Sequence, residues 1–134
     1  MFAWLQLRRP GLAILAVASL LAMTLTKVEG LVWASVLLLG WGGTYGAITT
    51  GGNRLRKEGY PVSTAHLRYL NPLPSDLEDV IGRFKKVLIP ELNLGQLRFL
   101  IRSNYCVDAI GLNKVQGRPF FVAEIVEAIK NQLA

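Results

Sequence analysis

The chain has 134 residues, a length that allows one domain, and its 51% hydrophobic content is enough to bury a core. Its formal net charge of +6 comes from basic residues scattered along the chain, which favours a solvated basic surface over nucleic-acid binding. A single cysteine, Cys106, excludes an intramolecular disulfide, a cysteine-held iron–sulfur cluster and a cysteine zinc site. A histidine metal site or a Ser-His-Asp triad would depend entirely on His66, the single histidine.

The first thirty residues are an apolar N-terminal segment, and we place the boundary of the following domain at residue 31. Arg8 and Arg9 precede an uncharged run over residues 11–26, which resembles the start of a signal peptide or signal anchor. The run is shorter than the roughly 20 residues that span a bilayer, and no convincing cleavage site follows. Three interpretations stay open: a signal or membrane anchor, an apolar helix packed on the domain or a partner, and a foreign or misassigned start.

The first half of the domain alternates between strand and helix patterns. A continuous apolar run over residues 36–40 predicts a strand buried on both faces, as in a parallel sheet. Glycines then make a tight turn, and residues 46–58 predict a helix that ends at Gly59. Residues 62–69 predict a second strand, and a rigid proline loop follows at residues 71–74.

The second half continues the alternation. Ser75 and Glu78 form a capping-box pattern that predicts a helix to about residue 84. Strands are predicted over residues 86–90 and 107–112, and the helix between them, over residues 95–105, has an apolar stripe. A last helix is predicted over residues 121–133. The fold class is therefore α/β, with a mainly parallel, doubly wound sheet of four to five strands.

Ligands in such folds bind at the carboxyl ends of the strands, and those ends carry many glycines and polar residues here. The loop at residues 40–46 follows a strand, but its third glycine comes one residue late for a dinucleotide fingerprint. No phosphate-binding P-loop motif occurs. Gly42, Gly43 and Thr44 could hold an anion with backbone amides, or the glycines only let the strand turn sharply.

Two other strand ends also bear candidate groups. Glu91 and Asp108 could form a carboxylate pair, although nothing fixes their separation. Alternatively, Glu91 could orient a partner or cap the next helix, together with the neighbouring Asn93 and Gln96. Lys114, Gln116 and Arg118 form a basic polar loop, which suits either a partner or anion contact or a solvated turn.

Four motifs in fixed order carry a resemblance to a known family. They are GWGGTYGAI at 40–48, HLRYLNPLPSDL at 66–77, PELNLGQL at 90–97 and NKVQGRPF at 113–120. Together they resemble the C-terminal region of the alpha subunit of the 2-oxoglutarate:ferredoxin oxidoreductases, members of the 2-oxoacid:acceptor oxidoreductase family. The resemblance covers about residues 35–129.

The resemblance implies an α/β domain similar to the C-terminal domain of transketolase. It implies a holoenzyme that converts 2-oxoglutarate and coenzyme A to succinyl-CoA and reduces ferredoxin. Thiamine diphosphate, magnesium and iron–sulfur clusters would serve that chemistry in other domains and in the beta subunit, with no cofactor bound by this chain alone. The pyrimidine-binding domain expected before Lys27 is replaced by the apolar segment, so we expect a truncated alpha subunit or its final domain.

We therefore expect a structural and assembly domain of this oxidoreductase that is not catalytic alone, located in the cytoplasm, with the beta subunit and ferredoxin as partners. The alternatives are a small-anion-binding module tethered to a membrane through residues 11–26, and an autonomous nucleotide-dependent enzyme. The residues expected to contact a neighbouring domain, a subunit or an anion are Gly42, Gly43, Thr44, His66, Arg68, Asn71, Glu91, Asn93, Gln96, Lys114 and Gln116.

Overall fold

The computed structural model describes residues 35–134, which form the α/β domain. The predicted apolar N-terminal helix, the boundary at residue 31 and the possible anchor at residues 11–26 all lie outside the described residues.

A four-stranded sheet forms the centre of the domain. Its strands are β1 (Val36–Trp41), β2 (Val62–Leu67), β3 (Lys86–Glu91) and β4 (Ala109–Asn113), in the spatial order β2-β1-β3-β4. All three neighbouring pairs are parallel. The expectation of a parallel α/β sheet is confirmed, with four strands in the described part of the chain.

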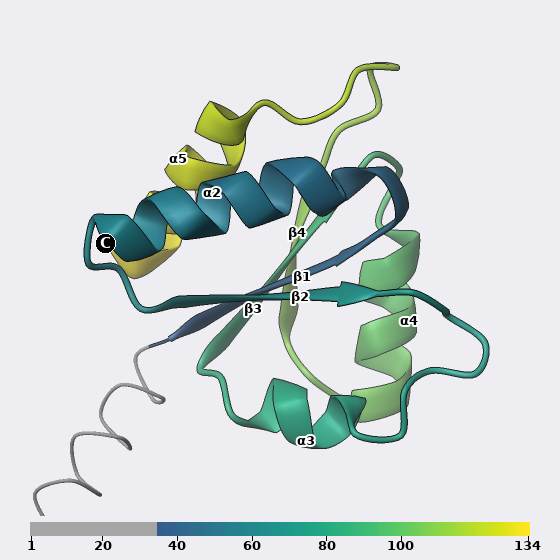
Figure 1. Ribbon diagram of the computed structural model, residues 1–134. Coiled ribbons are helices and arrows are strands. Elements are labelled where there is room, and N and C mark those ends of the chain that lie inside the picture. Colours follow the sequence, from purple (N-terminus) through teal and green to yellow (C-terminus); the bar gives the residue numbers. More distant parts are fainter. Residues whose placement is uncertain (1–34) are drawn as a thin grey trace, which may run out of the picture. The chain divides into compact units, whose positions relative to one another are not determined.

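Helices cover both faces of this sheet (Figure 1). Helix α2 (Tyr45–Lys57) and helix α5 (Val122–Leu133) lie on one face, and a 3-10 turn at Gly42–Thr44 leads into α2. Helix α3 (Leu77–Gly82) and helix α4 (Gln96–Tyr105) lie on the other face. Each crossover between parallel strands thus contains a helix, which is the usual connection in such sheets.

The sheet separates two apolar cores. Leu38 of β1 packs with residues of α2 and α5, whereas Leu37 and Leu39 pack with residues of α3 and α4. Alternate side chains of a strand point to opposite faces, so the continuous apolar run of β1 supplies both cores. Its residues from Val36 to Leu39 are at most 1% exposed.

Three predicted boundaries are wrong. Strand β2 ends at Leu67, two residues before the predicted end of the strand. Helix α3 begins at Leu77 after Asp76, with no side-chain cap, so the predicted capping box of Ser75 and Glu78 does not form. The Leu77 amide donates instead to the carbonyl of Pro74, because the proline loop already turns the backbone there. Strand β4 begins two residues later than predicted, since the Ala109 amide bonds to the Val107 carbonyl in a turn.

The topology identifies one place on the sheet where a ligand or partner is most easily accommodated. From β1 the chain crosses through α2 to β2 on one side, and from β3 it crosses through α4 to β4 on the other. The connections that follow β1 and β3 therefore leave these two neighbouring strands in opposite directions, and we call the place between their carboxyl ends the switch point. In open parallel sheets, ligands usually bind in a crevice at the switch point.

Candidate functional site

A hollow of about 120 Å³ lies at this switch point. The turn after β1 supplies one wall, and the end of β3 with the start of α4 supplies the other. The residues that line it are Trp41, Gly42, Gly43, Thr44, Glu91, Leu92, Asn93 and Leu97. Five of the candidate residues, Gly42, Gly43, Thr44, Glu91 and Asn93, therefore come together, although two separate loops carry them.

The polar side chains of this hollow cap the N-terminus of α4. Both oxygens of the buried Glu91 carboxylate accept backbone hydrogen bonds, from Leu97 at 2.7 Å and from Arg98 at 2.8 Å. The side-chain oxygen of Asn93 accepts the amides of Gly95 at 2.8 Å and Gln96 at 3.1 Å. The helix start, whose amides lack partners within the helix, is thereby satisfied by the chain's own side chains.

This arrangement makes the start of α4 a poor place for a small anion, whereas the anion contact predicted for the backbone amides of Gly42, Gly43 and Thr44 stays a prediction. An anion would meet the negative charge of Glu91, which is 5% exposed, and would find the first amides of α4 already bonded. On the opposite wall, the Thr44 hydroxyl donates to the carbonyl of Trp41 at 3.1 Å. The Glu91 carboxylate would repel an anion in the hollow, and such repulsion is strong at a buried site. The polar side chains of the hollow therefore serve to cap α4.

His66 lies one residue before the end of β2, opposite Gly40 of β1. Its ring meets the ring of Tyr45 edge-on, with centroids 5.0 Å apart. Its Nδ1 atom is buried and has no hydrogen-bond partner within residues 35–134. Burial lowers the pKa of the imidazole below its ordinary value, because desolvation disfavours the charged form.

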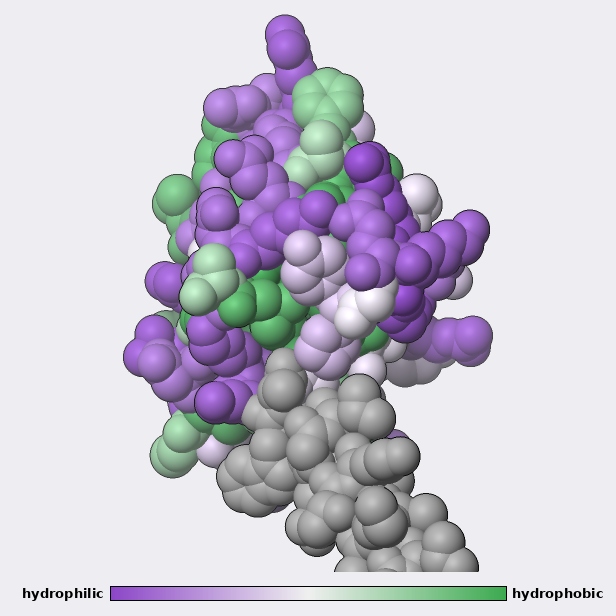
Figure 2. Space-filling model, turned by 90° about the vertical axis from the view of Figure 1, so that its left-hand side faces the viewer, coloured by the Kyte–Doolittle hydropathy of each residue, from purple (hydrophilic) through white to green (hydrophobic). Residues whose placement is uncertain are grey.

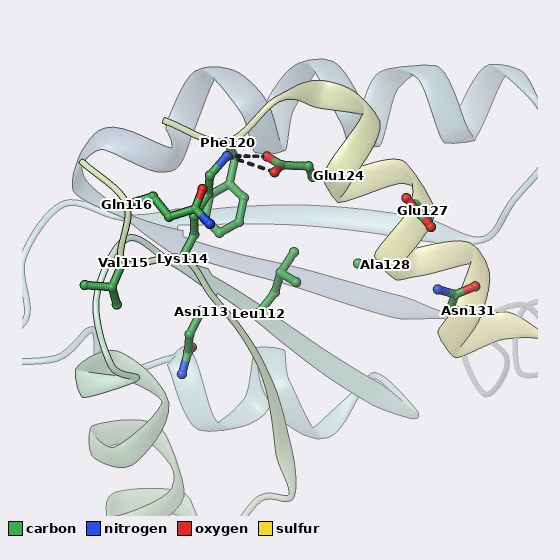
Figure 3. A pocket seen from close by; sticks show the side chains of 10 residues that line it. All are labelled: Leu112, Asn113, Lys114, Val115, Gln116, Phe120, Glu124, Glu127, Ala128 and Asn131. Atoms are coloured by element: carbon green, nitrogen blue, oxygen red, sulfur yellow. Dashed lines mark hydrogen bonds and ion pairs between the residues drawn. The ribbon is translucent and has the colours of Figure 1, made fainter. Parts of the chain in front are cut away.

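A second hollow of about 440 Å³ lies beside the edge strand β4, between the loop after β4 and α5 (Figure 3). Its main polar feature is Lys114, which is 8% exposed and points to the first turn of α5. The Lys114 ammonium donates to both carboxylate oxygens of Glu124 at 2.8 Å and to the Pro119 carbonyl at 3.2 Å. The centroid of the Phe121 ring lies 4.8 Å from the ammonium nitrogen.

Glu124 is a site residue that the sequence interpretation missed. Its carboxylate also accepts the backbone amide of Phe121 at 2.7 Å. The hydrogen bond from Lys114, followed by the one from Phe121, lowers the pKa of Glu124. An acidic residue in the first turn of a predicted helix was a usable signal, since such residues stabilise helix starts.

The remaining candidates do not gather into one site. Arg68 and Asn71 are exposed on the loop after β2, Gln96 is exposed at the start of α4, and Gln116 is exposed at the mouth of the second hollow. The suggested pair of Glu91 and Asp108 does not exist. Glu91 is the last residue of β3, at the carboxyl ends of the strands. Asp108 precedes β4 at the amino ends of the strands, where it forms an ion pair with Arg102 at 3.2 Å.

The described residues do not form the kind of multi-ligand site that would hold an iron–sulfur cluster. No three side chains of His, Cys, Asp or Glu within residues 35–134 gather closely enough to hold a metal ion. Cys106 is exposed at the far end of α4 from the switch point. An iron–sulfur cluster needs several cysteine thiolates, and the described residues supply one, so they cannot hold such a cluster by themselves.

The possible membrane anchor concerned residues 11–26, outside the described part of the chain. None of the helices between residues 35 and 134 has the length and apolar character that a bilayer-spanning segment needs.

Comparison with known proteins gives a consistent set of relatives. The chain is 48% identical over 101 residues to the 2-oxoglutarate oxidoreductase subunit KorA of Mycobacterium tuberculosis, covering 75% of the chain and 16% of that subunit. It is 35% identical over 103 residues to the alpha subunit of 2-oxoacid:ferredoxin oxidoreductase 2 of Aeropyrum pernix, covering 75% of the chain and 16% of that subunit. No protein-family profile matches it.

A solved structure has the same fold. It is the 2-oxoglutarate:ferredoxin oxidoreductase of Magnetococcus marinus with 2-oxoglutarate, coenzyme A and succinyl-CoA bound, and the match has a TM-score of 0.72 and 32% identity. It covers 76% of the present chain and 18% of the other chain. The chain thus spans about a sixth of the length of its relatives.

The parallel α/β fold and these matches define a domain of the 2-oxoacid:ferredoxin oxidoreductase family. More particularly, the chain matches a small region of the alpha subunit of the 2-oxoglutarate:ferredoxin oxidoreductases.

Proposed function

We propose that this chain is a structural and assembly domain of a 2-oxoglutarate:ferredoxin oxidoreductase, an enzyme that converts 2-oxoglutarate and coenzyme A to succinyl-CoA. The region corresponds to the C-terminal, transketolase-like part of the alpha subunit. It supports the complex by packing against its neighbours, and the reacting groups would be supplied by other parts of the enzyme. The matched relatives are named as subunits of such oxidoreductases.

The observation that carries the proposal is the internal use of the polar groups at the switch point. Glu91 and Asn93 together accept four backbone amides at the start of α4. A general acid or base must have its proton within reach of the substrate, and a carboxylate held in this way cannot offer that. Glu91 and Asn93 therefore serve to hold the loop and the helix start in place.

The cofactors of the reaction would be held elsewhere in the holoenzyme. Thiamine diphosphate and magnesium would belong to other domains, and the iron–sulfur clusters would pass electrons to ferredoxin through the beta subunit. The single cysteine within residues 35–134 cannot hold an iron–sulfur cluster, which supports this part of the proposal. This division of labour agrees with the small share of the relatives that the chain spans.

The test is a chimera of the Mycobacterium tuberculosis subunit KorA in which the matched region is replaced by that of this chain. Coexpressed with its beta subunit, the chimera should assemble and reduce an electron acceptor when given 2-oxoglutarate and coenzyme A. The control carries Ile89→Asp, which places a charge in the fully buried centre of β3 and should prevent assembly. A folded chimera that neither assembles nor reacts would refute the proposal.

A further inference from the structure

The second hollow, between the loop after β4 and helix α5, has the size of a small-molecule site. Its volume of about 440 Å³ lies within the range of about 300–1,000 Å³ that is usual for ligand pockets. One wall is an edge strand with the loop that follows it, and the other wall is one face of a helix. The proposed function needs nothing bound in this hollow, so its chemistry calls for a separate explanation.

The floor of the hollow is apolar. Leu112 of β4 points toward α5, and Ala128 lies across from it on the helix (Figure 3). Phe120, which is buried, adjoins Lys114 at one end of the hollow. The three apolar residues belong to the core on this face of the sheet or pack against it. A short hydrocarbon chain in the hollow would therefore lie on a fixed apolar surface.

The acids of the hollow outnumber its base. The charged residues among those that line it are Lys114, Glu124 and Glu127. The Lys114 ammonium meets three acceptors, as many as it has hydrogens, and two of them are the oxygens of Glu124. Glu127 is exposed and makes no ion pair within residues 35–134. The lining therefore carries one uncompensated negative charge, although the whole chain has a formal net charge of +6.

A third hollow, at the amino ends of the strands, has the opposite charge. It has a volume of about 220 Å³, and the charged residues that line it are Lys85 and Lys86. It lies on the side of the domain from which the strands start, which is mainly hydrophilic (Figure 2). A cation would be repelled there by two ammonium groups. The negative charge between β4 and α5 is thus a local feature of one hollow.

The two carboxylates of the hollow lie one helical turn apart. Residues three or four positions apart on a helix are neighbours, with Cβ atoms about 5–6 Å apart, so Glu124, Glu127 and Asn131 follow one another along α5 (Figure 3). The side chain of Glu124 is 40% exposed. Of the roughly four lone-pair sites of a carboxylate, Lys114 and the Phe121 amide use three. One site therefore remains for a further donor.

We propose that this hollow binds a small organic cation, in which a primary ammonium or guanidinium group is carried by a short hydrocarbon chain. The cationic group lies between Glu124 and Glu127 and donates to both carboxylates, while the side-chain oxygen of Asn131 accepts a further hydrogen bond. The hydrocarbon chain lies over Leu112 and Ala128. Hydrogen bonds between charged groups are stronger than neutral ones, so the cationic group orients the ligand and the apolar floor selects for the chain.

The walls of the hollow are held in place before a ligand arrives. The Lys114 amide donates to the carbonyl of Glu91 at 2.9 Å, which fixes the start of the loop against β3. The ion pair between Lys114 and Glu124 joins the loop to the first turn of α5 at 2.8 Å. A preformed site loses little conformational entropy on binding, which favours the binding of even a small ligand.

The first experiment titrates the full 134-residue chain with agmatine, which carries a guanidinium and an ammonium group on one hydrocarbon chain. NMR spectra should show saturable shifts for the side-chain amide of Asn131 and the backbone amide of Ala128, with a Kd of about 1 mM or below. Methylammonium, which lacks the chain, should bind about tenfold more weakly or worse. Shifts that grow in proportion to agmatine without saturating would overturn the proposal.

A pair of charge variants tests the location of the site. Glu127→Gln should weaken agmatine binding by about fivefold or more, because the ligand loses a charge-assisted hydrogen bond. The matched control, Glu78→Gln, removes the same charge from an exposed residue of α3, on the other face of the sheet (Figure 1), and should leave binding unchanged. Equal weakening by both variants would show only a general attraction of the cation to acidic residues, and the site would be refuted.

Ala128→Leu tests the apolar floor without changing any charge. The larger side chain fills the hollow, so saturable binding should be lost, while thermal unfolding reports whether the domain keeps its fold. A folded Ala128→Leu variant that binds agmatine as tightly as the unmodified chain would show that the ligand does not lie in the hollow. Should this variant fail to fold, the comparison of Glu127→Gln with Glu78→Gln, both at exposed positions, decides the question.

Calorimetric titration of the assembled chimera separates this proposal from the proposed function. A free organic cation should bind the chimera with the same affinity as the chain alone. Loss of binding on assembly would mean that a basic side chain of the oxidoreductase fills the hollow, and it would overturn the proposal of a free ligand. A chimera that fails to assemble refutes the proposed function, whereas the titrations of the chain alone still decide the ligand site.

Discussion

The Glu91 carboxylate and the Leu97 amide are joined by a hydrogen bond of 2.7 Å that links the end of β3 to the first turn of α4. Six residues separate the two along the chain, and the loop between them forms one wall of the switch-point hollow. A carboxylate at a helix start also interacts favourably with the helix dipole. This single side chain therefore determines both how α4 begins and what charge the hollow contains.

Replacement of Glu91 by Ala should destabilise the fold by about 2–4 kcal/mol, because two largely buried amides lose their acceptor. The control, Glu127→Ala, removes a carboxylate that is exposed on α5 and should change stability by less than about 0.5 kcal/mol. Urea unfolding followed by circular dichroism measures both. Equal effects of the two substitutions would mean that water replaces the Glu91 carboxylate at no cost.

Gly40 lies where three side chains approach the backbone of β1. A Cβ atom there would lie 2.3 Å from Cδ1 of Ile48, 2.9 Å from Oγ1 of Thr44 and 3.2 Å from Nδ1 of His66. Ile48 is 1% exposed and has little room to move, so Gly40→Ala should cost about 1–3 kcal/mol in thermal or urea unfolding.

Gly46 offers the matched control for Gly40. It lies in the first turn of α2, where an added Cβ would meet nothing within 4 Å. Gly46→Ala should therefore stabilise the domain, by about 0.5–1 kcal/mol, because alanine loses less backbone entropy in a helix. If Gly40→Ala proves as harmless as Gly46→Ala, the close packing at the end of β1 is not what requires glycine.

The imidazole of His66 should titrate below the ordinary value of about 6.5, because burial lowers its pKa. The sign follows from linkage: the unfolded chain binds the proton more tightly, so the contribution of His66 to stability is present above the unfolded pKa and is lost as pH falls through the folded pKa. His66 is the chain's single histidine, so its proton NMR titration is unambiguous.

Two further results bear on this prediction. Urea unfolding between about pH 7.5 and 5 should show stability falling with pH, and the variant His66→Gln should show a flatter profile over that range. An imidazole that titrates above its ordinary value would reveal a carboxylate or another acceptor near Nδ1.

Glu124 should contribute stability at neutral pH that disappears in acid. Its pKa is lowered, first by the hydrogen bond from Lys114 and then by that from the Phe121 amide. A lowered carboxyl pKa gives a contribution that is present above the unfolded value of about 4.3 and is lost as pH falls through the folded value. Carbon-detected NMR titration of the Glu124 carboxyl group measures the shift directly.

The variant Lys114→Met identifies the cause of that shift. It should return the pKa of Glu124 most of the way to its ordinary value, because the Lys114 hydrogen bond is the largest cause. Glu127→Gln, on the exposed side of the same helix, should leave the Glu124 titration unchanged. A Glu124 pKa that stays low in Lys114→Met would assign the shift to the backbone amide of Phe121.

The alternation of elements was readable because each carries its own local signal. The uninterrupted apolar run of β1 predicted a strand buried on both faces, and its residues supply the two cores of the sheet. The apolar stripe of α4 buries Leu97 and Ile101 as its spacing predicted. Signals of this kind depend on residues a few positions apart, so one sequence suffices to read them.

The polar residues were harder to interpret because the tertiary fold decides which groups come close enough to bond them. Ser75 has the right spacing for a cap, yet the proline loop makes the bond instead. Glu91 and Asp108 are both acids near strand ends, but a parallel sheet places them at opposite ends of its strands. Lys114 had the pattern of a surface loop, and its burial depends on Glu124, which lies ten residues away on α5.

By itself the sequence determined the α/β class, the order of the elements and the resemblance to an oxidoreductase alpha subunit, because these depend on apolar periodicity and on ordered local motifs. The tertiary structure alone decided that Glu91 and Asn93 serve as internal caps of α4 and that Glu124 pairs with Lys114 beside the second hollow. The physical reason is that parallel strands bring all their carboxyl ends to the same side. Groups that are distant in sequence thereby become neighbours.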